Sequence, residues 1–295
     1  MSTVTGDRRA RRARRIRLVL FGVGIVGVLL GINTTILHLT SDPLADVHAY
    51  YDAGARLNAG LPLYQQAATT NDAEFYRYPP LLAIVFRPLA LLPFEAAAAI
   101  WETVVVASLV GTVLVLRPDR MRLAVFGMLF LPIMWSVTIG QAQVPVTFLV
   151  ALGSPWAIAL AAHLKIFPAL VAIWWLGRRD CRSLGWFAAW SVGLGLVQLV
   201  LEPSGTLAFP GVFNLAQVGE VRNLSPYAIS PWIWIALVVA LGAVAIRSAP
   251  GRWGWAAAVA FAVLASPRLL VYQLMTLVAG TRAPDDPERR SSAGT

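Results

Sequence analysis

The sequence predicts an all-α integral membrane protein that crosses a lipid bilayer several times. Of the 295 residues, 58% are hydrophobic and only 13% are charged, and the mean hydropathy is +0.67. A soluble domain carries roughly twice this share of charged residues. The hydrophobic runs are also long and do not alternate with polar residues, which favours helices over the alternating strands of a membrane barrel.

Six hydrophobic runs are long enough, or nearly long enough, for a transmembrane helix of about 20 residues. They are residues 17–37, 94–116, 123–139, 184–201, 232–246 and 253–279. Residues 81–92 are too few to cross the bilayer, so they predict a re-entrant or surface helix. Residues 144–176 are too many for one straight helix and are interrupted by Pro155, Lys165 and Pro168. We therefore expect a bundle of about 8–10 spans or partial spans.

Five arginine clusters assign the two sides of the membrane. They occur at residues 8–17, 117–122, 178–182, 247–252 and 282–290. By the positive-inside rule all five are cytoplasmic, and so is the N-terminus. Residues 38–80, 140–143, 202–231 and a turn near residues 266–268 are then extracytoplasmic. Because topology explains the net charge of +9 and the pI near 10.5, we predict no nucleic-acid partner.

The chain divides into a basic cytoplasmic tail at residues 1–16, a transmembrane domain at residues 17–280 and a cytoplasmic tail at residues 281–295. Both tails are polar and rich in arginine, serine or proline, which predicts disorder. The first hydrophobic run lacks a convincing small-residue cleavage site, so we interpret it as an uncleaved span in the cell membrane. The single cysteine, Cys181, lies in a cytoplasmic segment and cannot form a disulfide framework.

The extracytoplasmic loop at residues 38–80 follows the first span directly. Its first part carries Asp42, Asp46, His48 and Asp52 in close succession. We expect residues 43–59 to form a helix on the membrane surface, with Asp46 one turn from Tyr50. Its apolar side would consist of Ala49, Ala53 and Leu57. A carboxylate beside apolar walls can serve as a base toward a hydroxyl group, whereas the alternative is a solvated loop in which Asp42 caps the helix.

Two cations stand in hydrophobic surroundings. Lys165 lies in a run of mostly apolar residues, where an ammonium costs about 2.5–3.5 kcal/mol if it is placed centrally. Arg268 follows Pro267 at a helix break. Both residue types bind phosphate, and Pro168 predicts a broken helix that lines a cavity beside Lys165. The alternatives are snorkelling of Lys165 to the interface and a water-exposed turn at Arg268.

Other motifs are less specific. Gln141 and Gln143 suit hydrogen bonds to sugars or to neighbouring helices, and Phe75, Tyr76 and Tyr78 are typical of an interfacial aromatic belt. Asn223 to Ser225 fit a glycosylation acceptor pattern, to which we assign no function. The sequence contains no GxxxxGK[ST], HExxH or GxSxG motif, and its histidines lack metal-ligand spacing. We therefore predict no metal site and no cofactor.

Five segments carry a resemblance to a known family. They are DVHAYYDAGARLNAGLPLY at residues 46–64, FYRYPPLLAIVFRPLALLP at 75–93, GQAQVPV at 140–146, LKIFPAL at 164–170 and SPRLLVYQ at 266–273. In this order they resemble glycosyltransferase family 87, the polyprenol-phosphate-mannose-dependent transferases of actinobacteria with the GT-C membrane fold. The resemblance implies an inverting transfer of a sugar, expected to be mannose, from a polyprenyl phosphate to a lipid-linked or cell-wall glycan at the outer membrane face.

The resemblance also implies that Asp46 is the catalytic base. From residue type, we expect Lys165 and Arg268 to bind the donor phosphate. The expected substrate-binding residues are His48, Tyr50, Tyr51, Tyr78, Gln141 and Gln143. Two alternatives stay open: a transporter or flippase for a lipid or small solute, and a catalytically inactive scaffold subunit.

Overall fold

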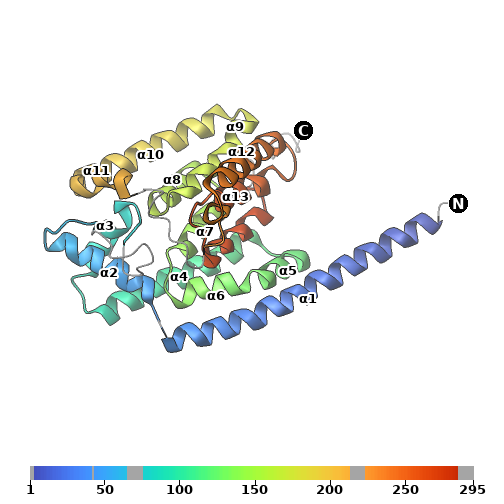
Figure 1. Ribbon diagram of the computed structural model, residues 1–295, viewed down its shortest axis with the longest axis horizontal. Coiled ribbons are helices and arrows are strands. Elements are labelled where there is room, and N and C mark those ends of the chain that lie inside the picture. The colour runs from blue at the N-terminus through green and yellow to red at the C-terminus, as the bar shows by residue number, and fades with distance from the viewer. Residues whose placement is uncertain (1–2, 42, 65–75, 213–222, 285–295) are drawn as a thin grey trace.

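The computed structural model describes residues 3–41, 43–64, 76–212 and 223–284. This part of the chain contains helices and turns and no strand (Figure 1). The predicted all-α membrane fold is thereby confirmed. In chain order the helices are α1 (Thr3–Ser41), α2 (Ala45–Asn58), α3 (Pro80–Leu89), α4 (Phe94–Leu116), α5 (Arg120–Met128), α6 (Phe130–Thr138), α7 (Gln143–Leu152), α8 (Pro155–Leu164), η1 (Phe167–Ala172), α9 (Ile173–Arg178), α10 (Cys181–Leu201), α11 (Pro203–Val212), η3 (Pro226–Ala228), α12 (Pro231–Ser248), α13 (Gly254–Leu264) and η4 (Val271–Thr281).

Four helices in the described residues are long and apolar enough to cross a membrane: α4, α10, α12 and the Leu18–Ser41 part of α1. The pair α5 and α6 meets the same test but bends by 59° at its junction. The remaining apolar helices, α3, α7, α8, η1 with α9, and α13, are too short to cross alone. The described fold thus combines full spans with partial spans. Only 6% of the apolar stretch of α10, and 6% of that of α12, is buried inside the protein. Such exposure of apolar side chains is expected where helices face lipid.

Two regions differ from the sequence prediction, the run at residues 123–139 and the N-terminal tail, whereas the turn expected near residues 266–268 is present. The run at residues 123–139 breaks at Leu129, because the ring of Pro132 clashes with the carbonyl three to four residues earlier in a continuous helix. The run at residues 253–279 breaks after α13, where Pro267 cannot continue the helix, and a turn was expected near residues 266–268. Helix α1 already begins at Thr3, whereas we expected a disordered tail.

Glycines let α1 approach the junction of α5 and α6 closely. A Cβ atom added to Gly27 would lie 2.2 Å from the carbonyl oxygen of Gly127, and one added to Gly31 would lie 2.4 Å from the Phe130 ring. Such close backbone approach is the usual basis of helix association in lipid, where burial of apolar surface provides no drive. Close backbone approach at these glycines therefore helps to attach the first span to the bundle, together with the ring contact of His38 with Trp135.

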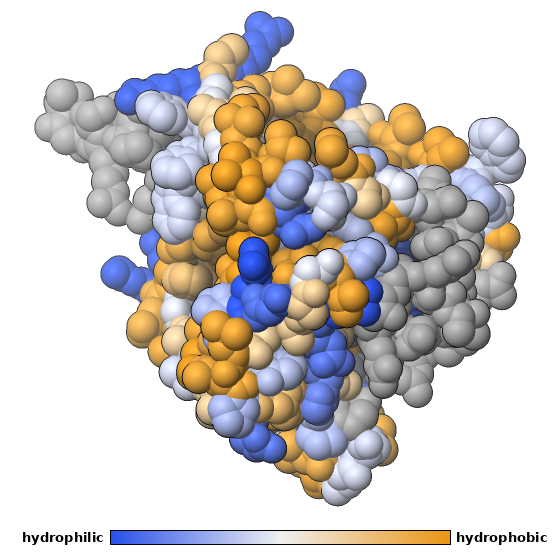
Figure 2. All heavy atoms as spheres, turned by 90° about the vertical axis from the view of Figure 1, so that its left-hand side faces the viewer, coloured by the Kyte–Doolittle hydropathy of each residue, from blue (hydrophilic) through white to orange (hydrophobic). Residues whose placement is uncertain are grey.

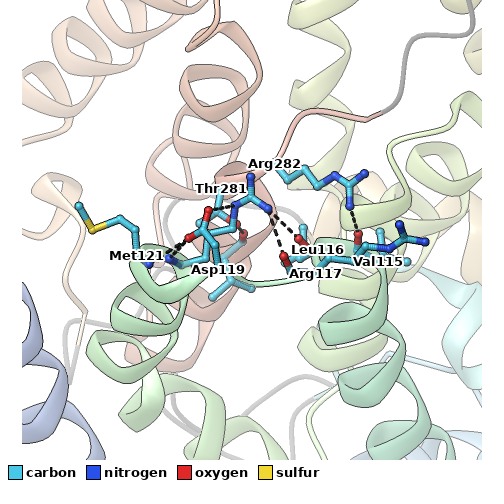
Figure 3. Close-up of polar contacts among 9 residues, drawn as sticks. Val115, Leu116, Arg117, Asp119, Met121, Thr281 and Arg282 are labelled. Carbon is cyan, nitrogen blue, oxygen red and sulfur yellow. Dashed lines mark hydrogen bonds and ion pairs between the residues drawn. The ribbon is translucent and has the colours of Figure 1, made fainter. Parts of the chain in front are cut away.

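The N- and C-termini lie at the same end of the molecule (Figure 1). Figure 3 shows the polar contacts at this end. Asp119 caps α5 by accepting bonds from the backbone N–H groups of Met121 and Arg122, each at 2.9 Å, and these bonds lower the pKa of its carboxyl. Arg122 donates to the carbonyl of Leu116 at 3.0 Å, and Arg282 to that of Val115 at 2.8 Å. Arginines of two predicted cytoplasmic clusters thus satisfy the last carbonyls of α4.

Candidate active site

Asp46 is positioned by end-to-end docking of α2 on α6. The backbone N–H of Leu44 donates to the carbonyl of Thr138 at 3.2 Å, and that of Asp46 to the carbonyl of Ile139 at 3.1 Å. The unpaired donors of one helix start therefore meet the unpaired acceptors of another helix end. Asp46 lies in the first turn of α2, where the helix dipole stabilises a carboxylate. Asp42, which would cap this helix in the alternative interpretation of the loop, lies outside the described residues.

Gly140 makes this docking possible. Its backbone has a φ of +66°, and the N–H of Gln141 donates to the carbonyl of Ser136 at 2.8 Å, which closes a Schellman turn at the end of α6. A Cβ atom at Gly140 would lie 2.1 Å from Cγ2 of Val47 and 2.7 Å from Oε1 of Glu102. Only glycine therefore permits both the left-handed turn and the contact with α2 and α4.

The side-chain Oε1 of Gln141 links Tyr50 and Tyr78, and Tyr78 in turn contacts the Asp46 carboxylate. This oxygen accepts a bond from the Tyr50 hydroxyl at 2.8 Å and lies 3.1 Å from the Tyr78 hydroxyl, which is itself 3.4 Å from Asp46 Oδ1. Burial raises the pKa of both phenols, so they remain neutral hydrogen-bond donors. The Nε2 atom of Gln141 is buried and has no hydrogen-bond partner among the described residues.

Lys165 stands at the break between α8 and η1, in extended backbone, as its sequence context predicts. Its ammonium donates to Oε1 of Gln143 at 2.8 Å and lies 5.2 Å and 4.7 Å from the ring centres of Tyr78 and Tyr272. Gln143 is held in turn, because its Nε2 donates to Oγ1 of Thr276 at 2.6 Å. Two aromatic faces and one amide thus hold the cation inside the protein. The ammonium has three N–H donors, and the bond to Gln143 uses one of them.

Further charges surround Tyr272. Its hydroxyl lies within electrostatic range of Asp46, Arg268 and Arg77, and Lys165 is in electrostatic range of Asp46. Tyr272 therefore has one carboxylate and three cations in its electrostatic surroundings. Arg77, Tyr272 and Thr276 were not predicted from the sequence. The signal for Arg77 was its position between two interfacial tyrosines, but nothing in the sequence distinguished Thr276.

His48 and Tyr51 point elsewhere. The His48 ring is exposed and stacks on Phe94 with a centroid distance of 3.8 Å, and the Tyr51 hydroxyl donates to the carbonyl of Leu92 at 2.7 Å. Both contacts attach α2 to the start of α4. The structure therefore brings together the other predicted residues of the site and places these two on a different face of α2.

The polar cluster lies away from the arginine-rich end. Figure 2 shows the end of the molecule that carries α2, α3 and α11, and hydrophilic residues gather near the middle of this otherwise largely hydrophobic face. Asp46 comes shortly after the last residue of α1, which is Ser41. Among the residues that the structure describes, no group of three or more His, Cys, Asp or Glu side chains could hold a metal ion.

Comparison with known proteins agrees with the resemblance seen in the sequence. The chain is 29% identical over 185 residues to the polyprenol-phosphate-mannose-dependent alpha-(1-2)-phosphatidylinositol pentamannoside mannosyltransferase of Mycolicibacterium smegmatis, which covers 56% of this chain and 45% of the relative. The protein of the same name from Mycobacterium tuberculosis is 27% identical over 215 residues, which is 63% of this chain and 47% of the relative. A phosphatidylinositol mannoside mannosyltransferase of M. smegmatis is 30% identical over 199 residues, with 56% and 45% covered.

This chain spans about half the length of the curated relatives it matches. No solved structure matches it. The family model for glycosyltransferase family 87 matches residues 75–278, which is more than half of the chain. Residues 75–278 include Tyr78, Gln141, Lys165 and Arg268. The chain therefore belongs to glycosyltransferase family 87.

Proposed function

We propose that this protein is a membrane mannosyltransferase that takes its sugar from a polyprenyl phosphate and transfers it to a glycolipid. The observation that carries the proposal is that Tyr78 contacts both Asp46 and Lys165, and that Lys165 also contacts Tyr272, which interacts electrostatically with Arg77 and Arg268. The relatives are named for a polyprenol-phosphate-mannose donor and phosphatidylinositol mannoside acceptors, so a donor and acceptor of these classes are the ones we propose here.

In the proposed reaction Asp46 is the general base. It removes the proton from an acceptor hydroxyl while that oxygen forms a bond to the anomeric carbon of the donor sugar. The bond from the anomeric carbon to the phosphate oxygen breaks at the opposite face, which inverts the configuration. The Tyr78 hydroxyl, 3.4 Å from Asp46 Oδ1, orients the carboxylate, and the Gln141 amide holds Tyr78 in turn.

The cations match the charge that develops on the leaving group. The donor phosphate is a diester with one negative charge, and departure of the sugar converts it to a monoester that gains a second one. Lys165, Arg77 and Arg268 would stabilise this added charge more than they stabilise the bound donor, which is how electrostatic groups accelerate a reaction. Because the phosphate leaves as an anion, no general acid is needed.

The proposed orientation follows from the two ends of the molecule. The arginine-rich end that contains both termini faces the cytoplasm, by the positive-inside rule. Asp46, at the opposite end and next to the last turn of α1, then lies at the outer boundary of the cell membrane. A lipid-linked donor and a glycolipid acceptor can both reach such a position from the bilayer.

The experiment that tests this function is sugar transfer in membranes containing Asp46→Asn. With radiolabelled polyprenyl-phosphate-mannose and a lipid extract, the unmodified protein should form a new labelled glycolipid. Loss of the base should reduce the rate about 100-fold or more, because general-base catalysis contributes typically 10²–10⁴-fold. Expression and membrane insertion should be unchanged.

The matched control is Asp52→Asn, which removes a carboxylate from the exposed side of the same helix and should leave transfer intact. Full activity of Asp46→Asn would refute the role of Asp46 as base. If the unmodified protein forms no glycolipid with any lipid extract, the transferase proposal fails, and a transporter or scaffold becomes the better explanation.

A further inference from the structure

The Asn223 side chain bonds to the backbone on both sides of Arg268. Its Nδ2 donates to the carbonyl of Pro267 at 3.0 Å, and its Oδ1 accepts from the N–H of Leu269 at 3.0 Å. The same Oδ1 accepts from the N–H of Ser225 at 2.9 Å, which fixes the amide in its own segment. Neither Pro267 nor Leu269 is close to Asn223 in sequence, so these bonds join two separate parts of the chain.

The segment that Asn223 holds is the break between α13 and η4. Backbone groups in such a break lack helical partners and must be satisfied within the protein where water is excluded. Ser266 Oγ donates to the carbonyl of Arg268 at 2.7 Å, and the N–H of Leu224 donates to the carbonyl of Leu269 at 2.8 Å. The backbone on either side of Arg268 is therefore bonded at successive peptide groups.

Asparagine is the residue type that suits this position. A carboxamide offers a donor and an acceptor side by side, so it can bond a carbonyl and an N–H together. Aspartate would keep the acceptor but lose the donor to Pro267, and alanine would lose both. The Asn223 to Ser225 pattern, to which we assign no function from the sequence, thus contains a structural asparagine whose side-chain nitrogen is bonded to the carbonyl of Pro267.

We propose that Asn223 is a positioning residue that holds Arg268 in the cation cluster beside Lys165 and Tyr272. The inference rests on the proposed function of that cluster in binding and stabilising a lipid phosphate. Lys165 lies 4.7 Å from the Tyr272 ring centre, and Arg268, which directly precedes η4, interacts electrostatically with the Tyr272 hydroxyl. A small displacement of the break moves the guanidinium relative to the phosphate, and misplacement by about 1 Å can cost about 100-fold in rate.

A double-mutant cycle in the full-length protein tests this role. Asn223→Ala should lower kcat about tenfold with a smaller change in the donor KM, because Arg268 acts mainly on the charge of the leaving phosphate. In an Arg268→Gln background the same substitution should change kcat by less than about twofold, since the group that it positions is already gone. An equal loss in both backgrounds would show a general structural role and overturn the proposal, as would full activity of Asn223→Ala.

Two further variants complete the design. Asn223→Asp has nearly the same size and should also lower kcat, which keeps the test valid if Asn223→Ala does not fold. Asn58→Ala is the matched control, because Asn58 donates to the carbonyl of Arg87 at 2.8 Å on the exposed end of α2. It should leave both kinetic constants unchanged.

Binding of polyprenyl phosphate to the purified protein separates this inference from the transferase function. If the unmodified protein binds polyprenyl phosphate and Asn223→Ala weakens binding only when Arg268 is present, the positioning role holds even without observed transfer. If transfer is observed but neither kcat nor binding responds to Asn223, the positioning role alone is wrong.

Discussion

Lys165 is held on several sides by the protein itself. Two tyrosine faces and the Gln143 oxygen hold its ammonium, and Thr276 fixes that amide. This arrangement compensates for much of the cost of placing a charge among apolar helices, since the cation has partners that do not depend on water. It also means that little reorganisation is needed when a phosphate enters, which is the property that makes electrostatic catalysis effective.

Replacing Lys165 with methionine should therefore reduce sugar transfer about 100-fold, the usual effect of removing one preorganised charge stabiliser. The loss should fall mainly on kcat and less on the donor KM, because the charge on the phosphate increases during the reaction. Steady-state kinetics with varied polyprenyl-phosphate-mannose measure both constants. Arg87→Gln is a suitable control, since Arg87 is bonded to Asn58 on the outer end of α2 and α3. Equal losses in the two variants would contradict a specific role for Lys165.

At the scale of elements, the start of α2 and the end of α6 form one unit. The Schellman turn at Gly140 exposes the carbonyls of Thr138 and Ile139 to the first N–H groups of α2. The same turn places the Gln141 side chain within hydrogen-bond distance of Tyr50. It also leads the chain into α7, where Gln143 accepts a bond from Lys165. The turn at Gly140 thus helps to position Asp46, the tyrosines that bond Gln141, and Lys165.

Gly140→Ala should destabilise the protein and disrupt the site together. The left-handed backbone alone costs about 1–2 kcal/mol for a residue with a Cβ, and the contact with Val47 adds to this. We expect a lower thermal unfolding midpoint in detergent and a loss of transfer at temperatures where the protein is still folded. Gly193→Ala on α10 is the control, because nothing lies within 4 Å of the added atom. A Gly140→Ala protein with unchanged stability and activity would argue against this role for the turn.

At the scale of the whole molecule, the two ends carry different sets of charged residues. Arg122 and Arg282 cap α4 at the end that holds both termini, whereas Asp46, Lys165 and Arg268 lie where α2, α3 and the helix breaks come together. In the proposed orientation the first end is cytoplasmic and the second is extracytoplasmic. A donor lipid would then place its phosphate near the outer boundary and its chain along the bundle.

Cysteine labelling in intact cells checks this orientation. Cys181, the single cysteine of the chain, is exposed at the start of α10 in an arginine cluster. A membrane-impermeant maleimide should label it only after the membrane is permeabilised. In a Cys181→Ser background, Ala59→Cys at the exposed end of α2 should be labelled in intact cells. The reverse pattern would place Asp46 on the cytoplasmic side and exclude the proposed reaction there.

Much of the fold follows from local properties of the sequence. Run length and arginine clusters predict the spans at α4, α10 and α12, because the bilayer imposes a length and the positive-inside rule a direction on each segment. Prolines predict the breaks beside Lys165 and Arg268. The bend at Leu129 was missed, since the effect of one proline within a uniformly apolar run depends on how neighbouring helices satisfy the freed carbonyls.

The sequence by itself determined that this protein is a helical membrane protein of glycosyltransferase family 87, with Asp46, Lys165 and Arg268 as its notable charges. Only the tertiary structure decided which of these groups meet. It joined Tyr78 to Gln141 and Lys165 to Gln143, turned His48 toward Phe94, and brought Asn223 to the backbone around Arg268. The physical reason is that hydropathy and charge act on each segment separately, whereas side-chain contacts between distant segments exist only after the helices have packed.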